Sequence, residues 1–151
     1  MHDLRFPLEP VLRYRSQLVD IAQQELGVLE SQRADAARWL EGLNTRHSLR
    51  LEQLRPFQGP QMNLVEMGRR LADMERLIRL IQEQQAALAR LDGLVQRKRQ
   101  QLLERSREMK LIERLRDKHL LEVRRLLARR EAQTLDDAGG IGFIRRRGLA
   151  R

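Results

Sequence analysis

Few side chains in this sequence have the chemistry of an active site, and those that do are widely separated. The three histidines, His2, His47 and His119, lie far apart along a chain of 151 residues that contains no cysteine. The absence of cysteine excludes disulfides, thiolate metal sites and cysteine nucleophiles. Three histidines that a helical fold keeps apart cannot share a metal ion, so we predict no metal site.

The acidic side chains are numerous, but they alternate with arginine at helical spacing. Glu104 and Glu108, for example, stand beside Arg105 and Arg107. Such spacing is typical of ion pairs on a helix surface and not of a catalytic carboxylate pair. The glycine-rich stretch 139–142 has no preceding strand and no Gly-Lys-Ser/Thr ending, so it does not match a phosphate-binding loop. We therefore predict that the protein is not an enzyme and uses no cofactor or small-molecule substrate.

The composition favours long helices that pack against each other. Hydrophobic residues make up 41% of the chain, aromatic residues only 3% and charged residues 34%. This balance is typical of long helices, and it holds too much apolar surface for a disordered chain. No apolar run approaches the ~18 residues of a membrane span, and the N-terminus lacks the apolar segment of a secretory signal. We expect a soluble protein of the cytosol.

A heptad pattern predicts a first helix over residues 8–55. Ten of the fourteen positions counted at alternating steps of three and four are apolar, and no strand-like alternation occurs. The positions are Leu8, Leu12, Arg15, Val19, Ala22, Leu26, Leu29, Arg33, Ala36, Leu40, Leu43, His47, Arg50 and Leu54. Two prolines and a glycine then predict a turn over 56–63. Asn63 is the expected N-cap of the next helix, with Glu66 completing a capping box.

The second helix is predicted over residues 64–135. Its heptad positions are Leu64, Met67, Leu71, Met74, Ile78, Ile81, Gln85, Leu88, Asp92 and Val95, followed by Leu102, Met109, Ile112, Val123 and Leu126. Joining the two groups requires a phase shift between residues 85 and 116, which a coiled coil tolerates as a stutter. The stretch from Asp136 to Gly140 is expected to end the helix, which leaves residues 136–151 as a flexible basic tail.

These elements predict an all-α antiparallel coiled-coil rod over residues 1–135. Neither helix can bury its apolar stripe alone, and a short connection makes the two helices antiparallel neighbours. With the turn centred near Gly59, residue i should face about residue 118 − i, so that Leu8 faces Lys110. Residues 111–135, which include His119, are then an overhang without a partner in the chain.

The basic excess is concentrated in the second half of the second helix. Between residues 97 and 130 there are thirteen positive and five negative side chains, out of a formal net charge of +9 for the whole chain. Three interpretations remain open: a solvated helix face, a surface for an acidic protein partner, and a site for nucleic acid or an anionic membrane. No aromatic residues interleave the basic ones for base stacking, and the heptads continue through this stretch, which disfavours nucleic acid.

The N-terminal sequence resembles a known family. The segment FPLEPVLRYR over 6–15, followed by AQQEL over 22–26, resembles the opening of the FliJ family of flagellar type III export proteins. The layout of helix, Pro/Gly turn and longer basic helix is also similar to this family. So is the ending, in which Leu135-Asp136-Asp137 precedes three arginines at 145–147.

The resemblance implies a non-enzymatic stalk or adaptor of the flagellar export apparatus. FliJ-like proteins form an antiparallel two-helix coiled coil similar to the central stalk of rotary ATP synthases. They bind the hexameric export ATPase, with the joined helix ends entering the ring, and they bind the export-gate membrane protein and help to recycle export chaperones. The implied location is cytoplasmic, peripherally associated with the inner membrane at the flagellar base. The alternatives are the equivalent stalk of a virulence injectisome and a generic self-associating coiled-coil scaffold.

Two sets of site residues follow as hypotheses from this resemblance. The ATPase-ring set is Leu8, Leu12, Arg15, Lys110, Arg114, Arg116, Lys118 and Arg125. The export-gate set is Trp39, Leu43, Arg46, Arg50, Arg70, Met74, Leu77 and Ile81. Arg46, Arg50 and Arg70 occupy positions where some family members have Tyr or Phe. Trp39 either packs beside Leu40 or is an exposed partner contact, and the sequence leaves both open.

Overall fold

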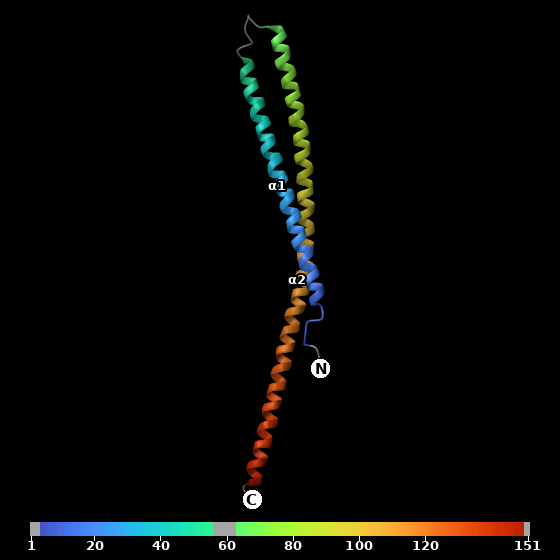
Figure 1. Ribbon diagram of the computed structural model, residues 1–151, viewed down its shortest axis with the longest axis vertical. Coiled ribbons are helices and arrows are strands. Elements are labelled where there is room, and N and C mark those ends of the chain that lie inside the picture. The colour runs from blue at the N-terminus through green and yellow to red at the C-terminus, as the bar shows by residue number, and fades with distance from the viewer. Residues whose placement is uncertain (1–3, 56–62, 150–151) are drawn as a thin grey trace. The chain divides into compact units, whose positions relative to one another are not determined.

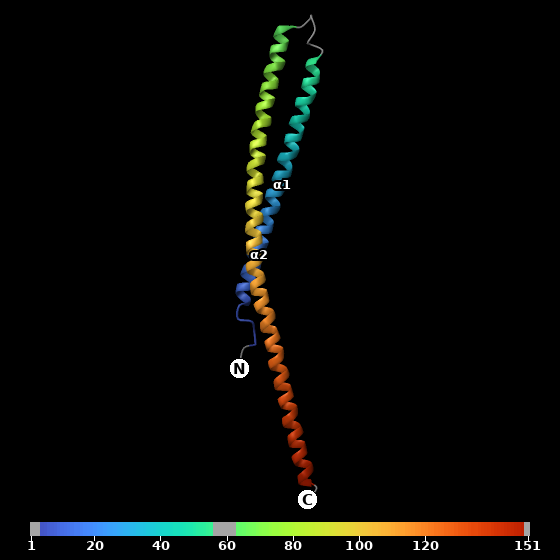
Figure 2. The same cartoon turned by 180° about the vertical axis from the view of Figure 1, so that it is seen from behind.

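The computed structural model describes residues 4–55 and 63–149, and in this part of the chain it contains two α-helices and no strand. Helix α1 spans Glu9–Leu54 and helix α2 spans Leu64–Leu149, with 46 and 86 residues. The predicted all-α fold with a longer second helix is confirmed. The chain forms two compact units: unit 1 is Met1–Val19 with Arg105–Arg151, and unit 2 is Asp20–Glu104. In each unit a segment of α1 packs against a segment of α2 (Figures 1 and 2).

Both helices begin as their local sequence predicts. The Leu8 carbonyl accepts the Leu12 N–H at 2.9 Å, and Pro10 occupies the first turn of α1, where its missing N–H costs nothing. At the start of α2, the Asn63 side-chain oxygen accepts the Val65 N–H at 3.1 Å, which confirms the N-cap.

The predicted capping box does not form, and most of the predicted turn lies outside the described residues. Glu66 turns to Arg70, with 3.4 Å between Oε1 and Nη2, instead of returning to Asn63 as a capping box requires. The predicted turn residues 56–62, including Gly59, lie outside the described part of the chain.

The predicted apolar stripe of α1 is the face that α2 covers. Eleven of its fourteen positions are buried or half-buried, and the exceptions are Leu8, Arg33 and Arg50. Ala22 is fully buried, and Leu43 is 2% exposed. We call the covered positions of the two helices the seam.

The seam of α2 differs from the predicted one. An unbroken alternation of three and four residues connects its covered positions from Met67 to Val123, so the predicted phase shift does not occur. Leu71, Ile78 and Gln85 are exposed, and the residues just before each of them are covered instead. The covered positions are Met67, Arg70, Met74, Leu77, Ile81, Gln84, Leu88, Leu91, Val95, Lys98, Leu102, Arg105, Met109, Ile112, Arg116, His119 and Val123.

A row of polar residues explains this difference. Every second seam position of α2 from Arg70 onward forms a line in which five of eight residues are polar: Arg70, Gln84, Lys98, Arg105 and His119, which we call the polar row. A search for apolar periodicity alone passes over such a line, because it treats polar residues as surface residues.

Members of the polar row reach acceptors on the N-terminal part of the chain. In unit 2, Gln84 Nε2 donates to the Ala36 carbonyl at 3.3 Å, and Lys98 forms an ion pair with Glu25. In unit 1, Arg105 Nη1 donates to the Leu18 carbonyl at 3.3 Å, and His119 Nε2 lies 3.1 Å from the Leu4 carbonyl oxygen. Polar groups that leave water are stable in a seam only when they find such partners.

Ion pairs between the helices fix a facing pattern that differs from the expected one. Lys98 pairs with Glu25 in unit 2, where the expected pattern places Asp20 opposite Lys98. Arg15 pairs with Glu108 at 2.5 Å in unit 1, where the expected residue is Pro10. The displacement is five residues in both units. The expectation was wrong because it took the helix ends to be level, whereas α2 begins beyond the end of α1 in unit 2 (Figure 1).

The displacement also shortens the part of α2 that has no partner. Ile112, Arg116, His119 and Val123 are half-buried, whereas every residue of 124–141 is exposed. The predicted overhang from residue 111 is therefore wrong, because the N-terminal residues of unit 1 cover α2 as far as Val123.

The helix end predicted near Leu135 is also wrong, since α2 continues to Leu149. None of the described glycines has a positive φ angle, so Gly139, Gly140 and Gly142 have ordinary helical geometry. Each glycine weakens a helix by about 1 kcal/mol relative to alanine, but glycine does not stop a helix as proline does. Arg146 and Arg147 in the last turn favour the helix because they lie at the negative end of its dipole.

Replacing Lys98 by leucine should stabilise the protein, because an apolar side chain at a seam position avoids the desolvation of an ammonium group. The Lys98 side chain is only 21% exposed. We expect Lys98→Leu to raise the free energy of unfolding in urea by on the order of 1 kcal/mol. Arg99→Leu, at a neighbouring side chain that is 54% exposed, is the control and should change it by less than about 0.5 kcal/mol. A less stable Lys98→Leu variant would contradict the prediction.

Replacing Gly139 and Gly140 together by alanine should increase helicity. A Cβ atom at either position meets nothing within 4 Å, so only the helix propensity changes. The gain of about 1 kcal/mol per residue should appear as a stronger far-ultraviolet circular dichroism signal at 222 nm and slower proteolysis near these residues. A weaker signal or faster proteolysis in the variant would contradict a helix through these residues.

Candidate partner-binding surfaces

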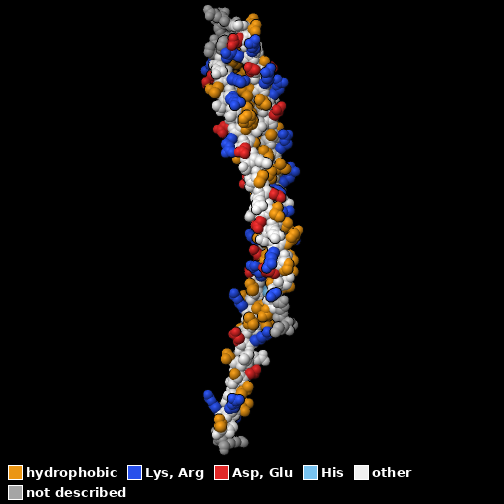
Figure 3. Space-filling view, viewed as in Figure 1, with side chains coloured by type: hydrophobic (Ala, Val, Ile, Leu, Met, Phe, Trp, Pro, Cys, Tyr) orange, Lys and Arg blue, Asp and Glu red, His pale blue; other side chains and the backbone are white. Residues whose placement is uncertain are grey.

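The described residues contain neither a cluster of three or more His, Cys, Asp or Glu side chains suited to a metal ion nor a helix that could span a membrane. Basic, acidic and apolar side chains are mixed on the face of the molecule that Figure 3 shows. Candidate surfaces must therefore be identified from the exposure and partners of individual side chains.

Four residues of the predicted sites are buried in the seam. Leu12 in unit 1 is 6% exposed, and Leu43, Met74 and Leu77 in unit 2 are 2%, 6% and 5% exposed. A partner cannot reach these side chains while α1 and α2 remain packed. Their role is to hold the helices that carry the exposed residues.

Four basic residues of the ATPase-ring set share one exposed face of α2 in unit 1. Lys110, Arg114, Lys118 and Arg125 are all exposed. At about 100° per residue they lie within an arc of about 80°, on the side of the helix opposite the seam. We call these four residues the basic face. No ion pair connects them to another residue in the described part of the chain.

The other residues of the ATPase-ring set do not join the basic face. Arg15 lies on the seam side of α1, paired with Glu108. Arg116 is half-buried in the seam, and its Nε atom is buried without a hydrogen-bond partner. Leu8 is 37% exposed at the start of α1. The structure thus divides the predicted set into an exposed face and a packed group.

Two apolar residues of this face escaped the sequence reasoning. Leu111 and Leu121 are 58% and 48% exposed, and their helical positions fall within or beside the arc of the basic face. These two leucines add exposed apolar area to the basic face. Both leucines lie outside the heptad positions, and an apolar residue outside the heptad is the sequence signal that could have identified them.

In unit 2, Trp39 is an exposed residue of the export-gate set. Its side chain is 55% exposed, and the Arg46 guanidinium carbon lies 5.9 Å from the ring centroid. Of the two positions that the sequence left open for Trp39, packed beside Leu40 or exposed, the structure therefore has the exposed one. The cation–π contact orients the indole and leaves much of it open to solvent.

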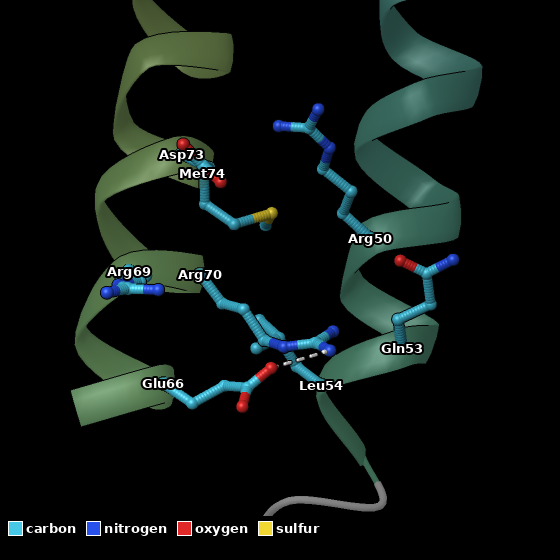
Figure 4. A pocket seen from close by; sticks show the side chains of 8 residues that line it. All are labelled: Arg50, Gln53, Leu54, Glu66, Arg69, Arg70, Asp73 and Met74. Carbon is cyan, nitrogen blue, oxygen red and sulfur yellow. Dashed lines mark hydrogen bonds and ion pairs between the residues drawn. The ribbon is translucent and has the colours of Figure 1, made fainter. Parts of the chain in front are cut away.

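Three other residues of the export-gate set line a small cavity in unit 2, between the C-terminal end of α1 and the first turns of α2 (Figure 4). The cavity has a volume of about 320 Å³ and is lined by Arg50, Gln53, Leu54, Glu66, Arg69, Arg70, Asp73 and Met74. Arg70 and Met74 extend from α2 toward α1, and Arg70 contacts Glu66. Ile81, the remaining member of the set, is half-buried in the seam.

The histidines have structural positions. His47 is half-buried on the seam of α1, and His119, in unit 1, contacts the N-terminal segment of the chain instead of lying in an overhang. His2 lies outside the described residues.

Comparison with known proteins supports the resemblance of the N-terminal sequence. The family model described as "Flagellar FliJ protein" matches residues 4–148. The comparisons with curated proteins and with solved structures found no match. A match of this extent includes α1, all of α2 except its last residue, the basic face and Trp39. The chain therefore belongs to the FliJ family of flagellar proteins.

Proposed function

We propose that this protein is a stalk or adaptor of flagellar protein export that binds the hexameric export ATPase through the basic face. Membership of the FliJ family makes the chain a component of the flagellar export apparatus, and this family consists of structural export components rather than enzymes. The proposal adds the ring as the partner, coupling of the ring to the export gate, and a share in recycling export chaperones at the inner membrane.

The basic face carries the proposal for the ring. Its four cations are solvent-exposed, lie on one side of α2 and have no acidic partner among the described residues. Such a surface attracts an acidic partner over distances of about the Debye length, ~8–10 Å, and aligns it before close contact. Leu111 and Leu121 add apolar area that a partner could bury.

Trp39 supports a second contact, with the export-gate membrane protein. Tryptophan and arginine are the residue types that most often dominate binding energy in protein interfaces. Trp39 and Arg46 present both types on one exposed surface of unit 2. The buried Leu43, Met74 and Leu77 of the predicted gate set would then act by packing beneath this surface.

Reversing the charge of the basic face should abolish binding to the purified export ATPase. The variant Lys110→Glu, Arg114→Glu, Lys118→Glu and Arg125→Glu keeps the seam intact, so its circular dichroism should match that of the parent protein. The matched control reverses four exposed arginines of other surfaces, Arg55, Arg79, Arg90 and Arg97. We expect more than tenfold weaker binding in a sedimentation assay for the first variant only. Equal loss in the control, or unchanged binding of the first variant, would reject the proposal.

Trp39→Ala should weaken binding to the cytoplasmic part of the export-gate protein by roughly tenfold or more. The melting temperature should change little, because the side chain is 55% exposed. Leu51→Ala is the control, since Leu51 lies on the same helix and is 48% exposed. Isothermal titration calorimetry of the three proteins measures the difference, and equal affinities for parent and Trp39→Ala would rule out this contact.

A further inference from the structure

The N-terminal residues 4–8, which we call the N-terminal strap, contact α2 within unit 1. His119 Nε2 lies 3.1 Å from the Leu4 carbonyl oxygen. The Phe6 and His119 rings are in tilted contact, with 5.6 Å between their centroids and 46° between their planes. The strap therefore has a defined position on the helix.

A groove lies between the strap, the first turns of α1 and the seam side of α2. Its volume is about 790 Å³, within the range of about 300–1,000 Å³ that is usual for ligand sites. Leu4, Phe6, Pro7 and Leu120 provide its apolar lining. Leu4 and Leu120 remain 37% and 45% exposed, so part of this apolar surface is open to a ligand.

The charges that line the groove are predominantly positive. Arg5, Arg13 and Arg116 contribute three guanidinium groups, and Glu9 contributes one carboxylate. The Nε atom of Arg116 is buried without a hydrogen-bond partner. The rest of the Arg116 side chain is half-buried and lines the groove, where its charge is less screened by water than that of an exposed arginine.

We propose that this groove binds an acidic peptide segment that carries at least one apolar side chain. The carboxylates contact Arg116 and Arg13, and the apolar side chain lies against Leu4 and Leu120. A peptide fits better than a nucleic acid, because base binding needs exposed aromatic rings and the Phe6 ring is in contact with His119. This inference goes beyond the proposed function, because it depends neither on the basic face nor on the ATPase.

Fluorescence anisotropy of the full chain with a short fluorescein-labelled peptide of alternating Glu and Leu tests the inference. Arg116→Gln and Arg13→Gln should each weaken binding by about tenfold, the loss expected for one charge-assisted contact. Arg13 is exposed, so its replacement keeps the test valid if Arg116→Gln disturbs folding. The control Arg129→Gln, on an exposed part of α2 away from the groove, should change the affinity by less than about twofold.

Variant peptides separate groove binding from attraction to a basic protein in general. Replacing Glu by Gln should abolish binding, and replacing Leu by Ser should weaken it by about tenfold. Equal affinity of the Ser peptide, or an equal loss in Arg129→Gln, would overturn the proposal. So would stronger competition by a single-stranded oligonucleotide of the same charge. These results are independent of whether the ATPase binds, so the two proposals can fail separately.

Discussion

The packing of α1 against α2 through a partly polar seam is the constraint on which the other features depend. Two helices with only apolar residues between them can slide by a heptad at little cost, since each shift restores similar contacts. Here Gln84 and Arg105 reach specific backbone carbonyls, and Lys98 reaches Glu25, so each unit favours one facing pattern. The polar groups make the packing of the two helices less stable than an entirely apolar seam would, but they specify how the helices are aligned.

This alignment decides which side chains remain available to partners. Leu12, Leu43, Met74 and Leu77 are used in packing. Lys110 and its neighbours in the basic face, and Trp39 in unit 2, remain exposed. A chain with no metal-binding cluster among its described residues can still have specific surfaces, because the seam presents chosen residues on the outer sides of rigid helices.

The sequence predicted some of these features well. The heptad positions of α1 and the N-cap at Asn63 could be read directly, because they depend on local spacing and residue type. The seam of α2 could not, because polar residues such as Gln84 and Lys98 occupy covered positions that depend on acceptors supplied by α1. The end of α2 was predicted too early, because the glycines at 139 and 140 were expected to end the helix, whereas glycine only weakens a helix. The division of the ATPase-ring set required knowledge of which side of each helix is covered.

The facing pattern is the central claim, and a charge swap between the helices tests it most directly. Glu25 pairs with Lys98 and Glu30 pairs with Arg99 in unit 2. Glu25→Lys with Glu30→Lys should lower the melting temperature, because each new lysine then faces a cation. Adding Lys98→Glu and Arg99→Glu should restore the temperature to nearly that of the parent protein, since the pairs are rebuilt in reverse. If the quadruple variant is no more stable than the double variant, these residues do not face each other.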